Sequence, residues 1–232
     1  EARKWGFENI SIDLIFGVPG LTEQIWHATL REAIELCPAH ISAYSLSVDD
    51  GAKLCREQRE GTVDLPDEAL VAQQYETAVL MLADAGYQQY EISNFSKPSF
   101  ECRHNLNYWD RGEYVGIGPG AWSFRGNRRS RNIAAVDAYV ERLGQNRLPV
   151  DFDETLEKSQ AAEEALFLGL RKTAGIDLSE FAAEHGAPVA ERIIRQVESL
   201  LKTGLFFFEK GRLRLSRRGM LLSTEALSLI AV

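Results

Sequence analysis

Two acidic residues lie within segments whose residue pattern is typical of strands. Asp13 interrupts the alternating run 9–17, and Glu91 interrupts the run 88–93. Each falls on the strand face opposite the main apolar residues. A buried carboxylate is costly unless donors satisfy it, and the two hydroxyls of a ribose would do so. The pattern predicts a polar ligand-binding cavity. The alternatives are an internal Asp13 bonded to its neighbours and an edge strand with Glu91 in solvent.

A histidine in a dense polar and aromatic segment is the next candidate. Residues 104–109 read His-Asn-Leu-Asn-Tyr-Trp, and Cys102 precedes His104 by two positions. Histidine and cysteine are iron ligands, and aromatic rings can wall a flat macrocycle. The alternative is an irregular loop, over 94–113, that is pinned by burial of Trp109 while His104 makes an ordinary hydrogen bond.

Two later segments have the composition of anion-binding loops. Gly118 and Gly120 flank Pro119 without the lysine or helix start of a P-loop, so we expect a close-packed loop that lines a pocket. An arginine run follows, which would hold carboxylates such as porphyrin propionates, or RNA phosphates, or would simply be solvated. The run consists of Arg125, Arg128, Arg129 and Arg131.

The elements that position these residues alternate between strand and helix. This order predicts βα units with a parallel sheet, whose ligands bind at the carboxyl ends of the strands. Three or four strands form only half a barrel, with unpaired edges, so we expect a further N-terminal half in a longer protein. The expected strands are 9–17, 40–48, 88–93 and 114–118, the expected helices are 22–37, 67–85 and 137–144, and the expected linker is 146–153.

The pattern changes after the linker. Helices are expected over 154–171, 177–185 and 188–203, followed by a hairpin of 205–209 and 212–216 and a last helix after Gly219. Three helices and a hairpin predict a small winged-helix-like module. We therefore expect two domains, 1–147 and 148–232. A basic wing suggests DNA contact, but the mixed charge of the preceding helix argues against it.

Composition narrows the class of protein. The chain has 26 basic and 34 acidic residues among 232, a net charge of −8, which disfavours general binding to nucleic acid. Its longest purely apolar run, 78–83, is far shorter than the roughly 20 residues of a membrane span. Three cysteines without a signal peptide predict a reducing, cytoplasmic setting. Cys37, Cys55 and Cys102 lack CxxC or CxxxCxxC spacing, so no metal site is expected from them.

Four segments in series resemble one family. They are Ile12-Asp13-Leu14-Ile15-Phe16-Gly17-Val18-Pro19-Gly20, His40-Ile41-Ser42-Ala43-Tyr44-Ser45-Leu46, Tyr90-Glu91-Ile92-Ser93-Asn94-Phe95 and His104-Asn105-Leu106-Asn107-Tyr108-Trp109. Their order and spacing are similar to those of the radical SAM haem chaperones, relatives of oxygen-independent coproporphyrinogen III oxidase. The resemblance covers nearly the whole chain. It implies an α/β fold: the later βα units of a partial (β/α)6 radical SAM barrel, followed by the small helical, winged-helix-like C-terminal domain of that family.

The resemblance also implies two sets of site residues. For S-adenosylmethionine, Asp13 would hold the ribose, Tyr44 and the backbone near Leu46 would lie beside the adenine, and the loop of Gly118, Gly120 and Ala121 would close the pocket. For haem, the implied residues are those of the histidine segment: His104, Asn105, Tyr108 and Trp109.

The chain lacks one motif of the family that it resembles. The CxxxCxxC motif that binds a [4Fe–4S] cluster is absent, so the cluster ligands are expected outside this chain, which should not cleave S-adenosylmethionine alone. The implied function is part of a chaperone that binds haem and delivers it to respiratory haem proteins, with membrane contact only through the acceptor. The alternatives are an oxygen-independent coproporphyrinogen III oxidase, which decarboxylates propionates in porphyrin biosynthesis, and a winged-helix nucleic-acid-binding module.

Overall fold

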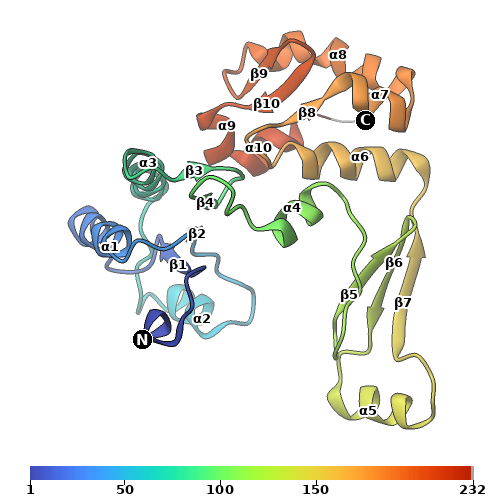
Figure 1. Cartoon of the computed structure of the whole chain (residues 1–232), viewed down its shortest axis with the longest axis horizontal. Coiled ribbons are helices and arrows are strands. Elements are labelled where there is room, and N and C mark those ends of the chain that lie inside the picture. The colour runs from blue at the N-terminus through green and yellow to red at the C-terminus, as the bar shows by residue number, and fades with distance from the viewer. Residues whose placement is uncertain (231–232) are drawn as a thin grey trace. The chain divides into compact units, whose positions relative to one another are not determined.

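The computed structural model describes residues 1–230, which divide into two compact units (Figure 1). Unit 1 comprises Glu1–Glu101, and unit 2 begins at Cys102. The predicted domains, 1–147 and 148–232, are defined by resemblance to a family and not by the compactness that separates these two units, and they stay a prediction. The last two residues of the second predicted domain lie outside the described part.

Unit 1 is an α/β layer structure. Strand β1 runs parallel to β2, with Ser11 opposite His40 and Phe16 opposite Ser45, as the alternation of strands and helices predicted. Its elements are η1 (Ala2–Trp5), β1 (Ser11–Phe16), α1 (Glu23–Glu35), β2 (His40–Ser45), α2 (Lys53–Arg59), α3 (Glu68–Asp84), β3 (Gln88–Gln89) and β4 (Asn94–Ser96).

The third predicted strand is wrong in both extent and direction. Residues 88–96 form a short antiparallel pair, β3 and β4, and β4 then runs antiparallel to β2. The sheet order is β1-β2-β4-β3. Residues 90–93 connect the pair, so Glu91 does not lie on a strand. The alternation of residue types does not correspond to two strand faces here, because the connection buries three successive side chains, Tyr90, Glu91 and Ile92.

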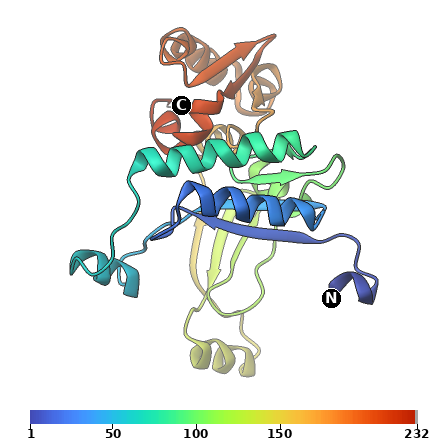
Figure 2. The same cartoon turned by 90° about the vertical axis from the view of Figure 1, so that its left-hand side faces the viewer.

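Helices α1 and α3 pack side by side against one face of this sheet (Figure 2). The Trp26 ring of α1 lies 5.7 Å from the Phe16 ring of β1, and its Nε1 donates to the carbonyl of Gln74 in α3 at 2.8 Å. Both helices begin where the sequence predicts, because Thr22 and Asp67 each accept a hydrogen bond from the backbone N–H three residues on. This core therefore fixes β1, which carries Asp13.

The first part of unit 2 is a three-stranded antiparallel sheet, in the order β5-β6-β7. Its elements are α4 (Arg103–Trp109), β5 (Trp122–Arg125), β6 (Arg128–Asn132), α5 (Val136–Gly144) and β7 (Val150–Thr155). The predicted linker at 146–153 is wrong because its second half, 150–153, belongs to β7. The predicted strand at 114–118 reduces to a single bridge between Tyr114 and Phe124.

The arginine run explains why this sheet escaped prediction. Successive charged residues on β6 show no apolar alternation, yet they pair with acids of β7 across the ladder. Arg128 donates to Asp153 at 2.7 Å, and Arg131 donates to Asp151 at 3.1 Å. The run is thus neither a loop nor, at these two positions, free to hold an added anion.

The rest of unit 2 has the predicted winged-helix-like pattern. Its elements are α6 (Lys158–Gly169), β8 (Ile176–Asp177), α7 (Leu178–His185), α8 (Ala187–Leu201), β9 (Phe206–Glu209), β10 (Arg212–Leu215), α9 (Arg217–Leu221) and α10 (Ser223–Ser228). Asp177 caps α7, and hydrogen bonds from the Ser179 hydroxyl and from the backbone N–H groups of Ser179 and Glu180 hold the pKa of Asp177 below its usual range. The strand order is β8-β10-β9.

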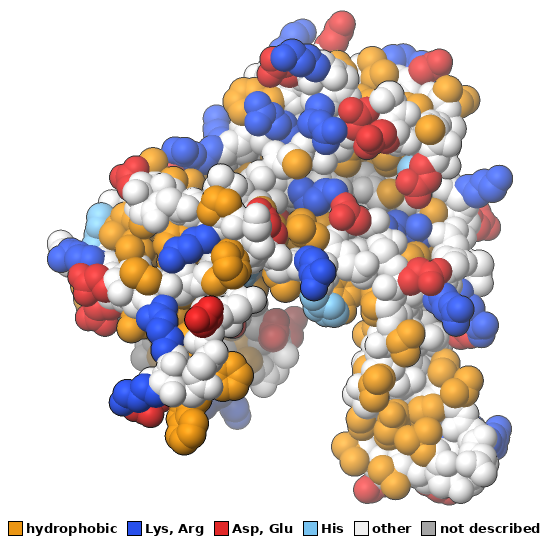
Figure 3. Space-filling model, in the orientation of Figure 1, with side chains coloured by type: hydrophobic (Ala, Val, Ile, Leu, Met, Phe, Trp, Pro, Cys, Tyr) orange, Lys and Arg blue, Asp and Glu red, His pale blue; other side chains and the backbone are white. Residues whose placement is uncertain are grey.

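Exposed apolar side chains gather over α5 and the adjoining ends of the β5-β6-β7 sheet (Figure 3). Patches of this kind commonly contact another surface. The exposed members include Ile117, Val136, Val140, Leu143 and Leu148.

Candidate functional site

The histidine segment forms helix α4, where the sequence predicted an irregular loop. The helix places His104 and Tyr108, four residues apart, on one face. Their rings meet edge-on at 4.8 Å, and the Tyr108 ring in turn meets that of Tyr114 at 4.7 Å. His104 is exposed, so its imidazole is accessible to a ligand. Asn105 is half-buried on the same helix.

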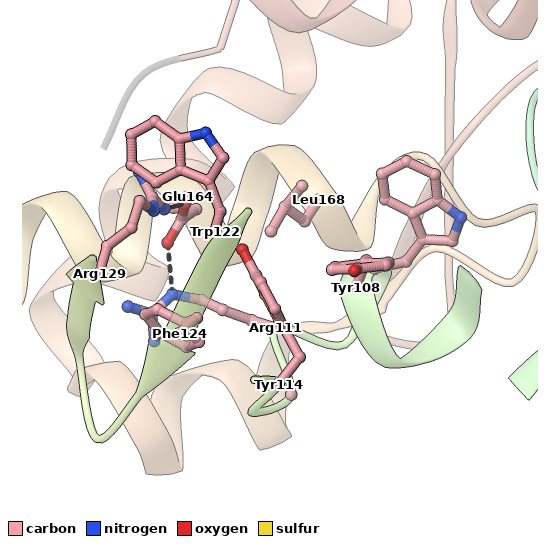
Figure 4. A pocket seen from close by; sticks show the side chains of 10 residues that line it. Tyr108, Arg111, Tyr114, Trp122, Phe124, Arg129, Glu164 and Leu168 are labelled. Atoms are coloured by element: carbon pink, nitrogen blue, oxygen red, sulfur yellow. Dashed lines mark hydrogen bonds and ion pairs between the residues drawn. The ribbon is translucent and has the colours of Figure 1, made fainter. Parts of the chain in front are cut away.

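Aromatic side chains from α4, the segment after it and β5 surround a cavity of about 440 Å3 (Figure 4). This volume lies within the range of small-molecule sites. Tyr108 and Trp109 line it, so two of the four haem residues implied by the resemblance meet at one cavity. The other lining rings belong to Tyr114, Trp122 and Phe124, and Leu168 of α6 completes the apolar wall.

A group of charged side chains interrupts this apolar lining. Arg111 Nε donates to Glu164 Oε2 at 2.8 Å, and Arg129 pairs with the other oxygen of Glu164. The Arg111 guanidinium also lies over the Phe124 ring, 4.6 Å from its centroid. Sequence reasoning missed Arg111 and Glu164 because neither stands in a motif; only Arg129 carried a signal, as part of the arginine run.

The packing of Trp109 supports the alternative in which this residue pins the segment in place. The guanidinium of Arg171, in the segment after α6, lies 4.6 Å from the centroid of the Trp109 ring at the end of α4. Trp109 Nε1 is nevertheless buried with no hydrogen-bond partner. An unsatisfied buried donor beside a cavity is costly, and a ligand acceptor would remove that cost.

The residues implied for S-adenosylmethionine fall in both units. In unit 1, Asp13 and Tyr44 lie on the sheet face opposite α1 and α3, and both are exposed. The Leu46 N–H donates to the Phe16 carbonyl at 2.8 Å, at the carboxyl end of β1. The accessible carboxylate of Asp13 stands in the middle of β1, and the Tyr44 ring lies near the carboxyl end of β2. An acceptor and an aromatic ring suit a ribose and a base. The expectation that Asp13 is buried is wrong for this chain.

His40 lies on β2, the strand next to β1, on the same sheet face as Asp13. Its titratable side chain is buried. It bonds Ser11 Oγ at 2.9 Å through Nδ1 and the Tyr90 hydroxyl at 2.8 Å through Nε2. Burial lowers the pKa of His40, and the Asp13 charge opposes that shift. The imidazole is therefore neutral near pH 7 and orders this part of the face through hydrogen bonds.

In unit 2, Gly118, Gly120 and Ala121 form a tight loop. Both glycines have positive φ, 106° and 71°, which other residues rarely adopt. Asn132 Nδ2 donates to the Gly118 carbonyl at 3.0 Å, and the Tyr139 hydroxyl accepts from the Gly118 N–H at 3.2 Å. A Cβ at Gly118 would meet nothing within 4 Å, so the expectation of a close-packed loop is wrong at this position, and the role of the loop at a cofactor stays a prediction.

The cysteines do not form a cluster site. Cys37 is exposed, Cys55 is buried and Cys102 is half-buried, and residues 1–230 contain no group of three metal-ligating side chains. The described residues therefore do not fit a [4Fe–4S] cluster. Within the same residues, no helix is both long and apolar enough to cross a membrane.

Comparisons with known proteins place this geometry in a family. Residues 156–222 match the HemN C-terminal domain. The fold matches coproporphyrinogen III oxidase (HemN) of Escherichia coli, a radical SAM enzyme, with a TM-score of 0.79, 19% identity and coverage of 98% of this chain and 56% of that chain. The fold is thus that of a radical SAM protein.

Sequence relatives narrow the class further. The heme chaperone HemW of Bacillus subtilis is 34% identical over 97% of this chain and 59% of its own length. HemW of Mycobacterium tuberculosis is 36% identical over 96% of this chain and 55% of its own length. The chain is thus similar to the HemW haem chaperones along nearly its whole length. It spans a little over half the length of these relatives.

Proposed function

We propose that this chain is the haem-binding part of a haem chaperone, and that the complete protein passes haem to acceptor haem proteins. The observation that carries the proposal is the accessible His104 imidazole, which meets the ring of Tyr108 edge-on, while Tyr108 itself lines an aromatic cavity. The names of the HemW relatives support it. His104 would ligate the iron, while Tyr108 and Trp109 would pack against the macrocycle and Asn105 would flank it.

The same proposal assigns S-adenosylmethionine to the residues implied by the resemblance. Asp13 would accept hydrogen bonds from the ribose hydroxyls, and Tyr44 and the Leu46 backbone would flank the adenine. The cofactor, when bound next to a [4Fe–4S] cluster, supplies radical chemistry or control of haem release. The cluster ligands are not among residues 1–230, so no step through the cluster is assigned to this chain.

Haem titration tests the assignment of His104. We expect the chain to bind haem with a shifted Soret band, and His104→Ala to weaken binding by about tenfold or more, because loss of a metal-supporting group costs at least that much. His27→Ala is the matched control, since His27 is also exposed but lies on α1 in unit 1. Equal affinity and an unchanged spectrum for His104→Ala would show that His104 is not the ligand.

A further inference from the structure

In the aromatic cavity, two guanidiniums share one carboxylate. Glu164 divides its two oxygens between two guanidiniums, Arg111 and Arg129. The side chains of Arg111 and Glu164 are only 13% and 23% exposed, so water screens this group weakly. A second acid, Glu154, approaches Arg129 only to 3.5 Å and is more exposed, at 39%.

The strand geometry singles out one arginine of the run. Arg129 lines the cavity, whereas its neighbour Arg128 pairs with Asp153 and is 64% exposed. Successive residues of a strand point to opposite faces, which separates the two side chains. The cavity thus combines apolar rings with two guanidiniums, whose planar donors match a carboxylate.

A ligand that suits both features is flat, aromatic and carries a carboxylate. Rings of Tyr108, Tyr114 and Trp122 offer stacking surfaces, and Arg111 and Arg129 face the same space (Figure 4). Burial raises the pKa of Tyr114, although Arg129 opposes that shift, so the phenol remains a neutral hydrogen-bond donor there.

We propose that this cavity holds a propionate-bearing edge of the porphyrin, with the carboxylate bound by Arg129 and Arg111 in exchange for part of their pairing with Glu164. The inference rests on the proposed function and extends it, since it assigns recognition of the acid groups to residues outside the histidine segment. Iron ligation by His104 and carboxylate recognition by the arginines are then separate contributions to affinity.

Metal-free probes separate these contributions. Protoporphyrin IX and its dimethyl ester are titrated into the unmodified chain, with Soret absorbance and tryptophan quenching as readouts. Neither probe carries iron, so His104 ligation does not contribute. We expect the free acid to bind about tenfold more tightly than the ester, because only the free acid offers the guanidiniums a charged acceptor.

Two neighbouring variants localise the effect. Arg129→Gln should remove most of the preference for the free acid and leave ester binding unchanged, whereas Arg128→Gln should keep the preference. Equal binding of acid and ester by the unmodified chain, or equal behaviour of the two variants when both are folded, would overturn the inference while haem binding stands. Failure of the unmodified chain to bind either haem or protoporphyrin IX would overturn the proposed function itself.

Discussion

Replacement of Trp26 by alanine should lower the free energy of unfolding of unit 1 by about 3–5 kcal/mol, the usual cost of truncating a large buried aromatic side chain. Trp26 is 1% exposed and joins three elements. Its ring packs on Phe16 of β1, and its Nε1 donates to the Gln74 carbonyl of α3. The alanine leaves a cavity and an acceptor without its donor.

Chemical denaturation followed by circular dichroism measures this loss. Trp5→Ala is the matched control, because Trp5 is 79% exposed, and changes at such sites usually stay within about 0.5 kcal/mol. Similar midpoints for Trp26→Ala and Trp5→Ala would contradict the packing of α1 and α3 on β1.

Replacement of Glu91 by alanine should destabilise unit 1 by about 2–6 kcal/mol, because two donors would lose their acceptor at about 1–3 kcal/mol each. Glu91 is 1% exposed and accepts from the Ser93 N–H at 2.8 Å and from the Asn94 side-chain amide. These bonds shape the connection between β3 and β4.

Two comparisons make this prediction specific. Glu91→Gln keeps an acceptor oxygen and should lose clearly less stability than Glu91→Ala in the same denaturation experiment. Glu76→Ala, at an exposed position of α3, should be nearly neutral. A loss for Glu91→Ala no greater than that for Glu76→Ala would show that the carboxylate does not organise the connection.

The sequence predicted unit 1 best where local signals agree. Thr22 and Asp67 cap the helices that the apolar periodicity indicates, and β1 and β2 pair in parallel as the intervening helix requires. The wrong strand at 88–93 has a different origin. There the side chain of Glu91 accepts from the Ser93 N–H and the Asn94 amide, two and three residues on, and so holds a tight connection in place of the predicted strand.

In unit 2, the residue pattern of single segments did not reveal the β5-β6-β7 sheet or the charged residues of the cavity. Strand β6 is polar along its whole length and pairs its Arg128 and Arg131 with Asp153 and Asp151 of β7, so β6 has no apolar face to recognise. Likewise, the cavity joins Arg111 and Glu164, which are 53 residues apart in sequence. The motif from His104 to Trp109 could be recognised by resemblance, but the charged partners that share its cavity require three-dimensional structure.

An experimental structure of the chain with bound haem tests the central claim most directly. The account predicts iron coordinated by the His104 imidazole and a porphyrin edge packed against Tyr108 in the aromatic cavity. Iron ligated by another side chain, with the macrocycle away from Tyr108, would contradict it.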